Sequence, residues 1–276
     1  SDIASNNRKI LSAAILVKQQ LFKKLLYEAG IRKENASDYK SPLLFSSGFH
    51  FKPAAFYFIK IHLSKNFRIP TFNDLYWETA NSEALRPETS HQIEVSNEII
   101  LIKNLKVIVT GYRVNISDMI QWVPGIASEW SPQNLNDVRT SGLEIISNLS
   151  HNIHNHKIEL SATYAYTVSE NRETGYQLIY VPYHKTTAAA AYSYHNFSAD
   201  YQFLFNGGVF TRSDNNPRYN HAPYAVSNVG LHYAFGTKKA LKLGLQVRNL
   251  FDEHYQVMRG RSFPGRNYNI YLNLNL

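Results

Sequence analysis

The last ten residues, 267–276, read Asn-Tyr-Asn-Ile-Tyr-Leu-Asn-Leu-Asn-Leu, and this stretch decides the fold class. Its apolar side chains recur at every second position, with mostly asparagine between them. Successive side chains of an extended chain point to opposite faces, so the pattern predicts a strand with one apolar and one polar face. The apolar set is Tyr268, Ile270, Leu272, Leu274 and Leu276.

The same alternation recurs along almost the whole chain. It is clearest from Ile158 to Val168 and from Phe197 to Phe205, where Ser, Thr, Glu, Asp and Gln occupy many of the intervening positions. We predict thirteen strands on this pattern. They lie near 8–19, 22–34, 42–52, 56–68, 89–103, 105–117, 138–151, 156–169, 184–195, 197–211, 224–236, 239–249 and 266–276. A short helix within Leu11–Leu26 remains an alternative.

The connections between these strands alternate strictly between short and long. The short ones fall near 20–21, 52–55, 104, 152–155, 195–196 and 237–238. The long ones fall near 35–41, 69–88, 118–137, 170–183, 212–223 and 250–265. All long loops then lie at one end of an up-and-down antiparallel sheet. This arrangement is typical of transmembrane β-barrels, which have short periplasmic turns and long extracellular loops.

Composition agrees with a barrel and excludes several other classes. No run of 18 apolar residues occurs, which excludes a transmembrane helix, whereas amphipathic barrel strands average to moderate polarity, here a mean hydropathy of -0.34. The chain has no cysteine, which excludes thiolate metal sites, disulfides and cysteine nucleophiles. The net charge of +8 comes from scattered Lys and Arg, so we expect a basic surface and no nucleic-acid partner.

An odd number of strands indicates that the barrel continues outside the chain. Bacterial single-chain barrels have even strand numbers. An open set of amphipathic strands also leaves two unpaired edges, which hydrocarbon does not tolerate. We therefore expect residues 1–276 to form the C-terminal part of a larger barrel.

Two groups of motifs identify a family. The first comprises Arg68-Ile69-Pro70-Thr71, followed by Leu75-Tyr76 and then by Leu85-Arg86-Pro87-Glu88. The second comprises 249–255, which reads Asn-Leu-Phe-Asp-Glu-His-Tyr, and Pro264-Gly265-Arg266. In this order the motifs resemble those of the TonB-dependent outer-membrane receptors. Asn81 stands four residues before Leu85, where the family usually has three.

The resemblance implies a function as well as a fold. A complete receptor would be a 22-stranded barrel with an N-terminal plug, and this chain would be its last thirteen strands. The plug, the first strands and the segment that contacts the TonB complex would lie outside it. The protein would be a transporter in the outer membrane of a Gram-negative bacterium, with no enzymatic activity and no cofactor. Its partners would be TonB, membrane lipid, a small-molecule ligand and a surface lipoprotein.

Aromatic residues in the long loops are the candidate ligand contacts. We predict a site formed by Tyr76, Trp77, Trp122, Trp130 and Asn134. Indole and phenol rings offer flat apolar surfaces for a planar or bulky ligand. Packing between loops, or an aromatic girdle at the membrane surface, would explain the same residues. The acidic residues of the strands should face the lumen and pair with basic residues there; they are Glu88, Glu94, Glu98, Glu144 and Glu159.

The loop sequences resemble the cobalamin-type receptors of Bacteroidetes. The segments concerned are Phe72–Trp77, Trp122-Val123-Pro124, Trp130–Leu135 and Ser141–Glu144. The implied substrate is cobalamin, and siderophore and haem receptors of the same fold remain alternatives. Haem would require an axial histidine, for which His221 is a better candidate than the periplasmic group below. That group is His151, His154 and His156, in a predicted periplasmic turn. We predict no metal site.

Two other classes remain open. A soluble β-sandwich that binds glycans would share the alternation. An outer-membrane barrel enzyme would require a Ser/His/Asp or paired acidic constellation, and we find none with convincing spacing, so no catalytic residue is predicted.

Overall fold

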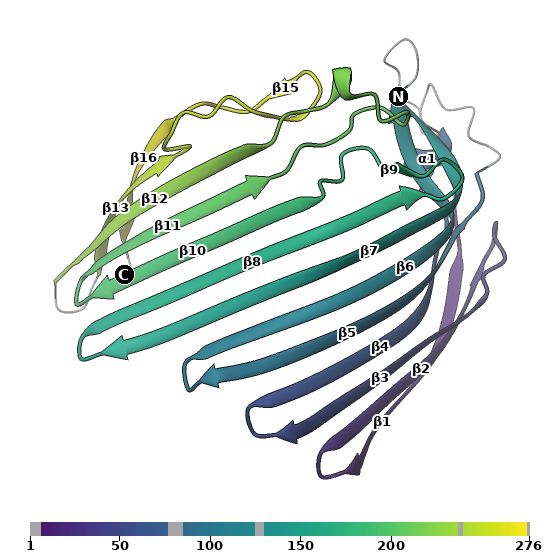
Figure 1. The fold of residues 1–276 in the computed structure, drawn as a ribbon, viewed down its shortest axis with the longest axis horizontal. Coiled ribbons are helices and arrows are strands. Elements are labelled where there is room, and N and C mark those ends of the chain that lie inside the picture. The colour runs from purple at the N-terminus through teal and green to yellow at the C-terminus, as the bar shows by residue number, and fades with distance from the viewer. Residues whose placement is uncertain (1–6, 77–84, 125–129, 237–239, 275–276) are drawn as a thin grey trace.

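The fold is one large antiparallel sheet, seen face-on in Figure 1. The computed structural model describes residues 7–76, 85–124, 130–236 and 240–274. Its strands are β1 (Ile10–Phe22), β2 (Leu25–Ala36), β3 (Leu43–Ala54), β4 (Tyr57–Arg68), β5 (Glu88–Ile102), β6 (Leu105–Pro124), β7 (Trp130–Ile153), β8 (His156–Asn171), β9 (Tyr176–Gln177), β10 (His184–Tyr194), β11 (Phe197–Asn206), β12 (Tyr224–Phe235), β13 (Leu241–Arg248), β14 (Gln256–Met258), β15 (Arg261–Ser262) and β16 (Asn267–Leu274). Its helices are α1 (Phe72–Tyr76) and the short 3₁₀ helix η1 (Pro217–Tyr219).

The predicted up-and-down topology is confirmed. The sheet runs β1-β2-β3-β4-β5-β6-β7-β8-β10-β11-β12-β13-β16, so the main strands pair with their neighbours in the chain. The small strand β9 pairs only with β8, and β14 and β15 form a separate hairpin. The segment for which a helix was the alternative is a strand, paired with β2 from Ile10 opposite Ala36 onward. The long connections gather at one end of the sheet and the tight turns at the other (Figure 1).

The prediction of a long loop at 118–137 is wrong. Most of this segment continues the hairpin of β6 and β7. Pairing passes the left-handed residue Asp118, whose φ is 56°, and extends to Pro124 opposite Trp130. Prolines at 124 and 132 favoured a loop. They are tolerated here because this extension is only two strands wide, and its outer edges need no ladder hydrogen bonds. Trp122, Trp130 and Asn134 therefore lie on strands, in the two-stranded extension of β6 and β7 at the long-loop end.

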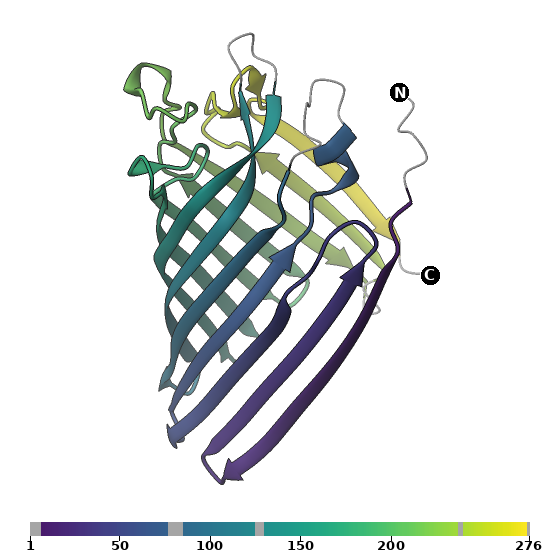
Figure 2. The same cartoon turned by 90° about the vertical axis from the view of Figure 1, so that its right-hand side faces the viewer.

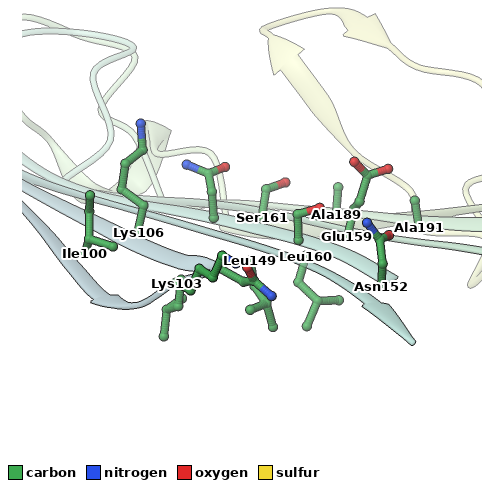
Figure 3. A pocket seen from close by; sticks show the side chains of 14 residues that line it. Ile100, Lys103, Lys106, Leu149, Asn152, Glu159, Leu160, Ser161, Ala189 and Ala191 are labelled. Carbon is green, nitrogen blue, oxygen red and sulfur yellow. The ribbon is translucent and has the colours of Figure 1, made fainter. Parts of the chain in front are cut away.

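The two faces of the sheet differ as the alternation predicts. Figure 2 shows the strands wrapping into a curved wall. In Figure 3, Lys106 and Ser161 point toward the side to which the wall curves, whereas Leu149 and Leu160 point away from it. Register agrees, because Leu149 lies opposite Leu160. The inner face is thus polar and the outer face apolar.

The outer face carries many exposed large apolar side chains, including Leu63, Ile93, Leu143, Leu160 and Leu231. A surface of this kind belongs against lipid and not water. Register places all five predicted glutamates on the inner face. Glu98 lies there 3.5 Å from the Lys60 ammonium and 3.9 Å from that of Lys106.

The small buried core lies at the long-loop end of the wall. Leu75 of α1, Leu85 and Ile120 of β6 form its hydrophobic cluster. The middle of the sheet is a single layer in the described ranges, so there is nothing there to bury apolar groups against. None of the helices that the structure describes is long and apolar enough to cross a membrane.

The motif from Asn249 has a structural role at the last long loop. Asn249 and Asp252 both adopt left-handed backbone conformations, with φ of 51° and 58°. The buried Asn249 amide donates to Glu253 O at 2.9 Å, and Asp252 Oδ1 accepts from Arg266 N at 2.7 Å. A Cβ at position 265 would lie 2.6 Å from Asp252 Oδ1, so a larger residue there would displace this carboxylate. The motif therefore folds this loop back onto the start of β16.

Candidate functional site

The motif that begins at Arg68 builds a polar network at the long-loop end. Arg68 is the last residue of β4, and its guanidinium donates two hydrogen bonds of 2.7 Å to the carboxylate of Glu88 of β5. Glu88 Oε1 also accepts from Ile120 N of β6 at 2.5 Å. The Arg68 guanidinium also lies 3.7 Å from Oδ2 of a second carboxylate, that of Asp74. Bidentate guanidinium–carboxylate pairs fix geometry strongly, so this network holds the ends of three strands and α1 in register.

Asp74 lies in the first turn of the short helix α1 and is buried. Its Oδ2 accepts from the backbone N of Thr71 at 2.9 Å and from Thr71 Oγ1 at 2.8 Å, as in a helix cap. Its Oδ1 accepts from Trp122 Nε1 at 2.9 Å. Burial opposes ionisation, but these hydrogen bonds and Arg68 outweigh it and hold the pKa of Asp74 below its ordinary value. The indole N–H of Trp122 is thus used inside the protein.

Asn134 forms a second internal clip. Its Oδ1 accepts from Arg86 N at 2.8 Å, and its Nδ2 donates to Arg86 O at 2.9 Å and to Asp118 O at 2.7 Å. The Arg86 guanidinium also reaches Asp118 Oδ1 at 2.7 Å. The Asn134 amide thereby attaches the end of the β4–β5 connection to the β6–β7 extension.

A cavity of about 240 Å³ lies between the long loops. Its aromatic walls include Trp130 of β7 and Tyr180, whose ring centroids are 6.0 Å apart. The ring of His221 lies 6.1 Å from that of Tyr180. Met258 of the β14–β15 hairpin and Tyr224 of β12 also contribute to the lining. With residues 206–209, five segments remote in sequence thus build one mostly apolar pocket.

His221 is the polar group of this pocket that stands out. Its Nε2 is buried and has no hydrogen-bond partner among the described residues. Burial, and then the nearby positive charge of Arg259, lower the pKa of His221, so the ring is neutral at physiological pH. A buried neutral nitrogen without a partner is costly, and a bound ligand could satisfy it. It could form a hydrogen bond or coordinate a metal centre.

A second cavity, of about 600 Å³, lies deeper on the inner face. Three stacked rings lie beside both cavities: Tyr224 on Tyr255 at 4.6 Å, and Tyr255 on Phe263 at 5.2 Å. Tyr224 lines the first cavity, whereas Tyr255 and Phe263 line the second. The second cavity also has polar walls, which include Gln202, Asn228, Arg248 and Asn267.

A third cavity, of about 700 Å³, lies near the short turns (Figure 3). In the figure, Lys106 and Glu159 project to the same side of the sheet as the small side chains Ala189 and Ala191, and Asn152 lies near Ala191. It is a broad hollow in the inner wall with charged and amide groups, and it lacks the aromatic walls of the loop cavity.

The predicted site residues fall into different settings. Trp130 lines the loop cavity. Tyr76 is exposed on α1, while Trp122 and Asn134 belong to the networks described above. Trp77 lies outside the described residues. Sequence reasoning did not select Tyr180, Tyr224 or Met258 for the site.

The histidines of the short turns show no metal-binding arrangement. Asn104 Nδ2 lies 3.1 Å from His151 Nδ1, and Tyr192 OH lies 2.7 Å from His156 Nδ1. Across the described ranges, no group of three or more His, Cys, Asp or Glu side chains could hold a metal ion.

Comparison with known proteins gives a consistent family. The profile of the family described as TonB dependent receptor-like, beta-barrel, matches residues 8–250. The Vitamin B12 transporter BtuB of Vibrio vulnificus (strain YJ016) is 26% identical over 252 residues, which are 90% of this chain and 39% of that protein. The chain thus spans well under half the length of this relative.

Solved structures share the fold at low sequence identity. The copper transporter OprC superposes with a TM-score of 0.78 at 16% identity, over 97% of this chain and 48% of that chain. The siderophore receptor PirA from Acinetobacter baumannii gives a TM-score of 0.78 at 16% identity, over 98% of this chain and 47% of that chain.

Proposed function

Because the chain belongs to the TonB-dependent receptor β-barrel family, we propose that its protein takes up cobalamin across the outer membrane. The family consists of Gram-negative outer-membrane transporters and not of enzymes. The extracellular end of the wall is then the long-loop end, and its polar inner face is the lumen.

Sequence similarity is the observation that carries the choice of substrate. A protein named as a vitamin B12 transporter is 26% identical over 90% of this chain. The copper and siderophore proteins are only 16% identical to this chain over the superposed residues. Their likeness reflects the common barrel, so it gives no argument for a copper or siderophore substrate.

The geometry supports the loop cavity as the first binding site. It lies at the extracellular end, and it offers the rings of Trp130 and Tyr180 and the unpartnered Nε2 of His221. Apolar pockets with a few polar groups are the usual form of small-molecule sites. The cavity of about 240 Å³ is small for such a site, so we propose that it holds one part of the ligand.

Coupling to TonB would run through a plug that lies outside these residues. The chain spans 39% of the length of the relative above, which leaves ample length for a plug and further strands. A surface lipoprotein that covers the loops also stays a prediction.

Ligand binding by the complete receptor in detergent tests the proposal. We expect cyanocobalamin to bind, and hemin and a ferric siderophore not to bind. His221→Phe keeps the ring volume and removes the polar atom, so it should weaken cyanocobalamin binding about tenfold, the value of one hydrogen bond. His254→Phe, at an exposed position of the last long loop, is the matched control and should leave the affinity unchanged.

The possible results separate the parts of the proposal. Failure of the wild-type receptor to bind cyanocobalamin would refute the substrate. Binding of the ferric siderophore or hemin instead would assign the protein to one of those alternatives. Equal affinities of His221→Phe and wild type would leave cobalamin standing and exclude the loop cavity.

A further inference from the structure

Tyr271 of β16 reaches across the inner face of the neighbouring strand β13. It lies opposite Gly244, and Gly244 lies opposite His232 of β12. The Tyr271 ring fills the space above Gly244, since a Cβ at that position would overlap the ring. The Tyr271 hydroxyl lies 2.7 Å from His232 Nδ1, so a side-chain hydrogen bond passes over β13 and joins β16 to β12.

His232 is itself held in place from the other side. Its Nε2 lies 2.7 Å from Asp200 Oδ1 of β11, and its side chain is only 14% exposed. Gly230, opposite Asp200, leaves room for that carboxylate, because a Cβ there would lie 2.5 Å from Oδ1. The hydrogen bonds from Tyr271 to Asp200 therefore connect four adjacent strands on the lumen side.

A second bridge of the same construction lies in the middle of the sheet. Tyr112 of β6 lies opposite Gly142 of β7, and Gly142 lies opposite Thr167 of β8. The Tyr112 hydroxyl is 2.9 Å from Thr167 Oγ1, and a Cβ at 142 would overlap that hydroxyl. In both bridges a tyrosine covers a glycine of the next strand and bonds to the strand beyond it.

The alternating sequence of β16 does not choose its register on β13. Among the described residues of β16, the inward positions hold three asparagines and Tyr271, and the outward positions are all apolar. A slip of two residues keeps every side chain on its own face. It also exchanges asparagine for asparagine at most inward positions. Tyr271 is different, because a slip would place its ring opposite Lys242 or Gln246 in place of Gly244.

Few other contacts oppose such a slip. β13 and β16 are only eight residues long each, and a long loop joins them. A loop of this length can gain or lose two residues at little entropic cost. At the start of β16, Asp252 Oδ1 accepts from Arg266 N at an exposed site, whereas the Tyr271 ring is half-buried. We therefore expect the tyrosine to outweigh the loop contact.

The register of β16 matters because this strand forms one edge of the described sheet (Figure 2). In a closed barrel that edge pairs with a further strand, and the stagger between strands is linked to their tilt and to the size of the barrel. We propose that the bridge from Tyr271 over Gly244 to His232 sets the register of β16, and thereby the stagger at which the barrel closes. This role does not depend on the transported substrate.

Disulfide cross-linking in the complete receptor measures the register. Residues 1–276 contain no cysteine, so introduced pairs report on this strand alone within them. Leu245→Cys with Ile270→Cys joins native partners on the outward face. Leu245→Cys with Tyr268→Cys joins residues that come opposite each other only after a two-residue slip. In the native register they are diagonal neighbours, too far apart for a disulfide.

The decisive variant moves the tyrosine by two residues. The exchange Asn269→Tyr/Tyr271→Asn keeps the composition, and its new tyrosine reaches Gly244 only in the slipped register. The disulfide of residue 245 should then shift from position 270 to position 268, with at least about a tenfold rise in the 268 product over the chain with Tyr271. Peptide mass spectrometry quantifies both products, and the heat-induced gel shift of folded barrels selects folded molecules.

Tyr112→Asn is the matched control, because it removes the tyrosine of the other bridge and should leave the 270 product dominant. Cross-linking of the exchange variant at 270 alone would overturn the proposal. So would Asp252→Ala if it raised the 268 product as much, since the loop would then set the register. If the exchange variant does not fold, Tyr271→Phe decides. It keeps the ring and loses the bond to His232, so the 268 product should rise roughly fivefold, and no rise would refute the bridge.

Discussion

Replacing Asp74 by asparagine removes the acceptor on which α1 depends. The Asp74 carboxylate receives hydrogen bonds on both oxygens: from Thr71 on Oδ2 and from the Trp122 indole on Oδ1. An amide has a single oxygen and an NH₂ group. In either orientation, the substituted side chain would therefore present a donor to a donor, and the favourable contact with Arg68 would lose its charge.

The cost should be local and measurable. The Asp74 side chain is only 6% exposed, so water cannot replace the missing acceptor easily. Loss of one charge-assisted hydrogen bond in such a place costs about 2 kcal/mol. An opening equilibrium shifted by that amount corresponds to roughly thirtyfold faster amide exchange in the segment.

Hydrogen exchange of the complete receptor, followed by mass spectrometry, measures this effect in peptides from residues 69–76. We expect the acceleration in Asp74→Asn and a smaller one in Trp122→Phe, which keeps the Thr71 bonds. Asp214→Asn is the matched control, because that carboxylate is exposed and lies 3.8 Å from Arg212. Unchanged exchange in Asp74→Asn would refute the role of this carboxylate in holding α1.

The same carboxylate predicts an acid dependence. Its pKa is lower in the folded protein than the ordinary 3.8, so its stabilising contribution is complete above that value and is lost as pH falls through the lower folded value. Wild-type exchange in residues 69–76, corrected for the intrinsic pH effect, should therefore rise below about pH 4, whereas Asp74→Asn should show no such step.

Three further substitutions test the framework around the site. Arg68→Met should lower the free energy of unfolding, measured in urea, by about 1–2 kcal/mol. The loss is smaller than for a fully buried ion pair because the Arg68 side chain is 45% exposed. Arg68→Lys should recover part of this loss, because it keeps the charge. Asn249→Ala should cost about 2–3 kcal/mol through lost hydrogen bonds and the left-handed backbone, and should raise protease cleavage in the last long loop; intact protection would contradict the role given to the motif. Gly142→Val should slow barrel folding, followed by the gel shift, because a Cβ there would lie 2.6 Å from Tyr166 O, and a normal rate would show that the strands can yield.

Alternation in the sequence was enough to predict the wall, its topology and its two faces. The pleat of a strand ties side-chain direction to position in the chain, so the inner placement of Glu98 and Glu159 could be inferred locally. The turn rhythm was equally local. The hairpin extension to Pro124 was missed, because prolines at 124 and 132 oppose a strand, and pairing of β6 with β7 prevailed.

The membership of the candidate site was decided by tertiary structure. Trp122 and Trp130 looked alike in the sequence, yet one indole donates to the buried Asp74 and the other lines the loop cavity. Tyr180 reaches that cavity from a left-handed backbone with φ of 59°, and His221 and Met258 come from other loops. Loop paths depend on contacts between distant segments, whereas strand faces follow from the chain's own period of two. The sequence by itself therefore determined the barrel wall and its family motifs, and only the folded loops determined which side chains meet.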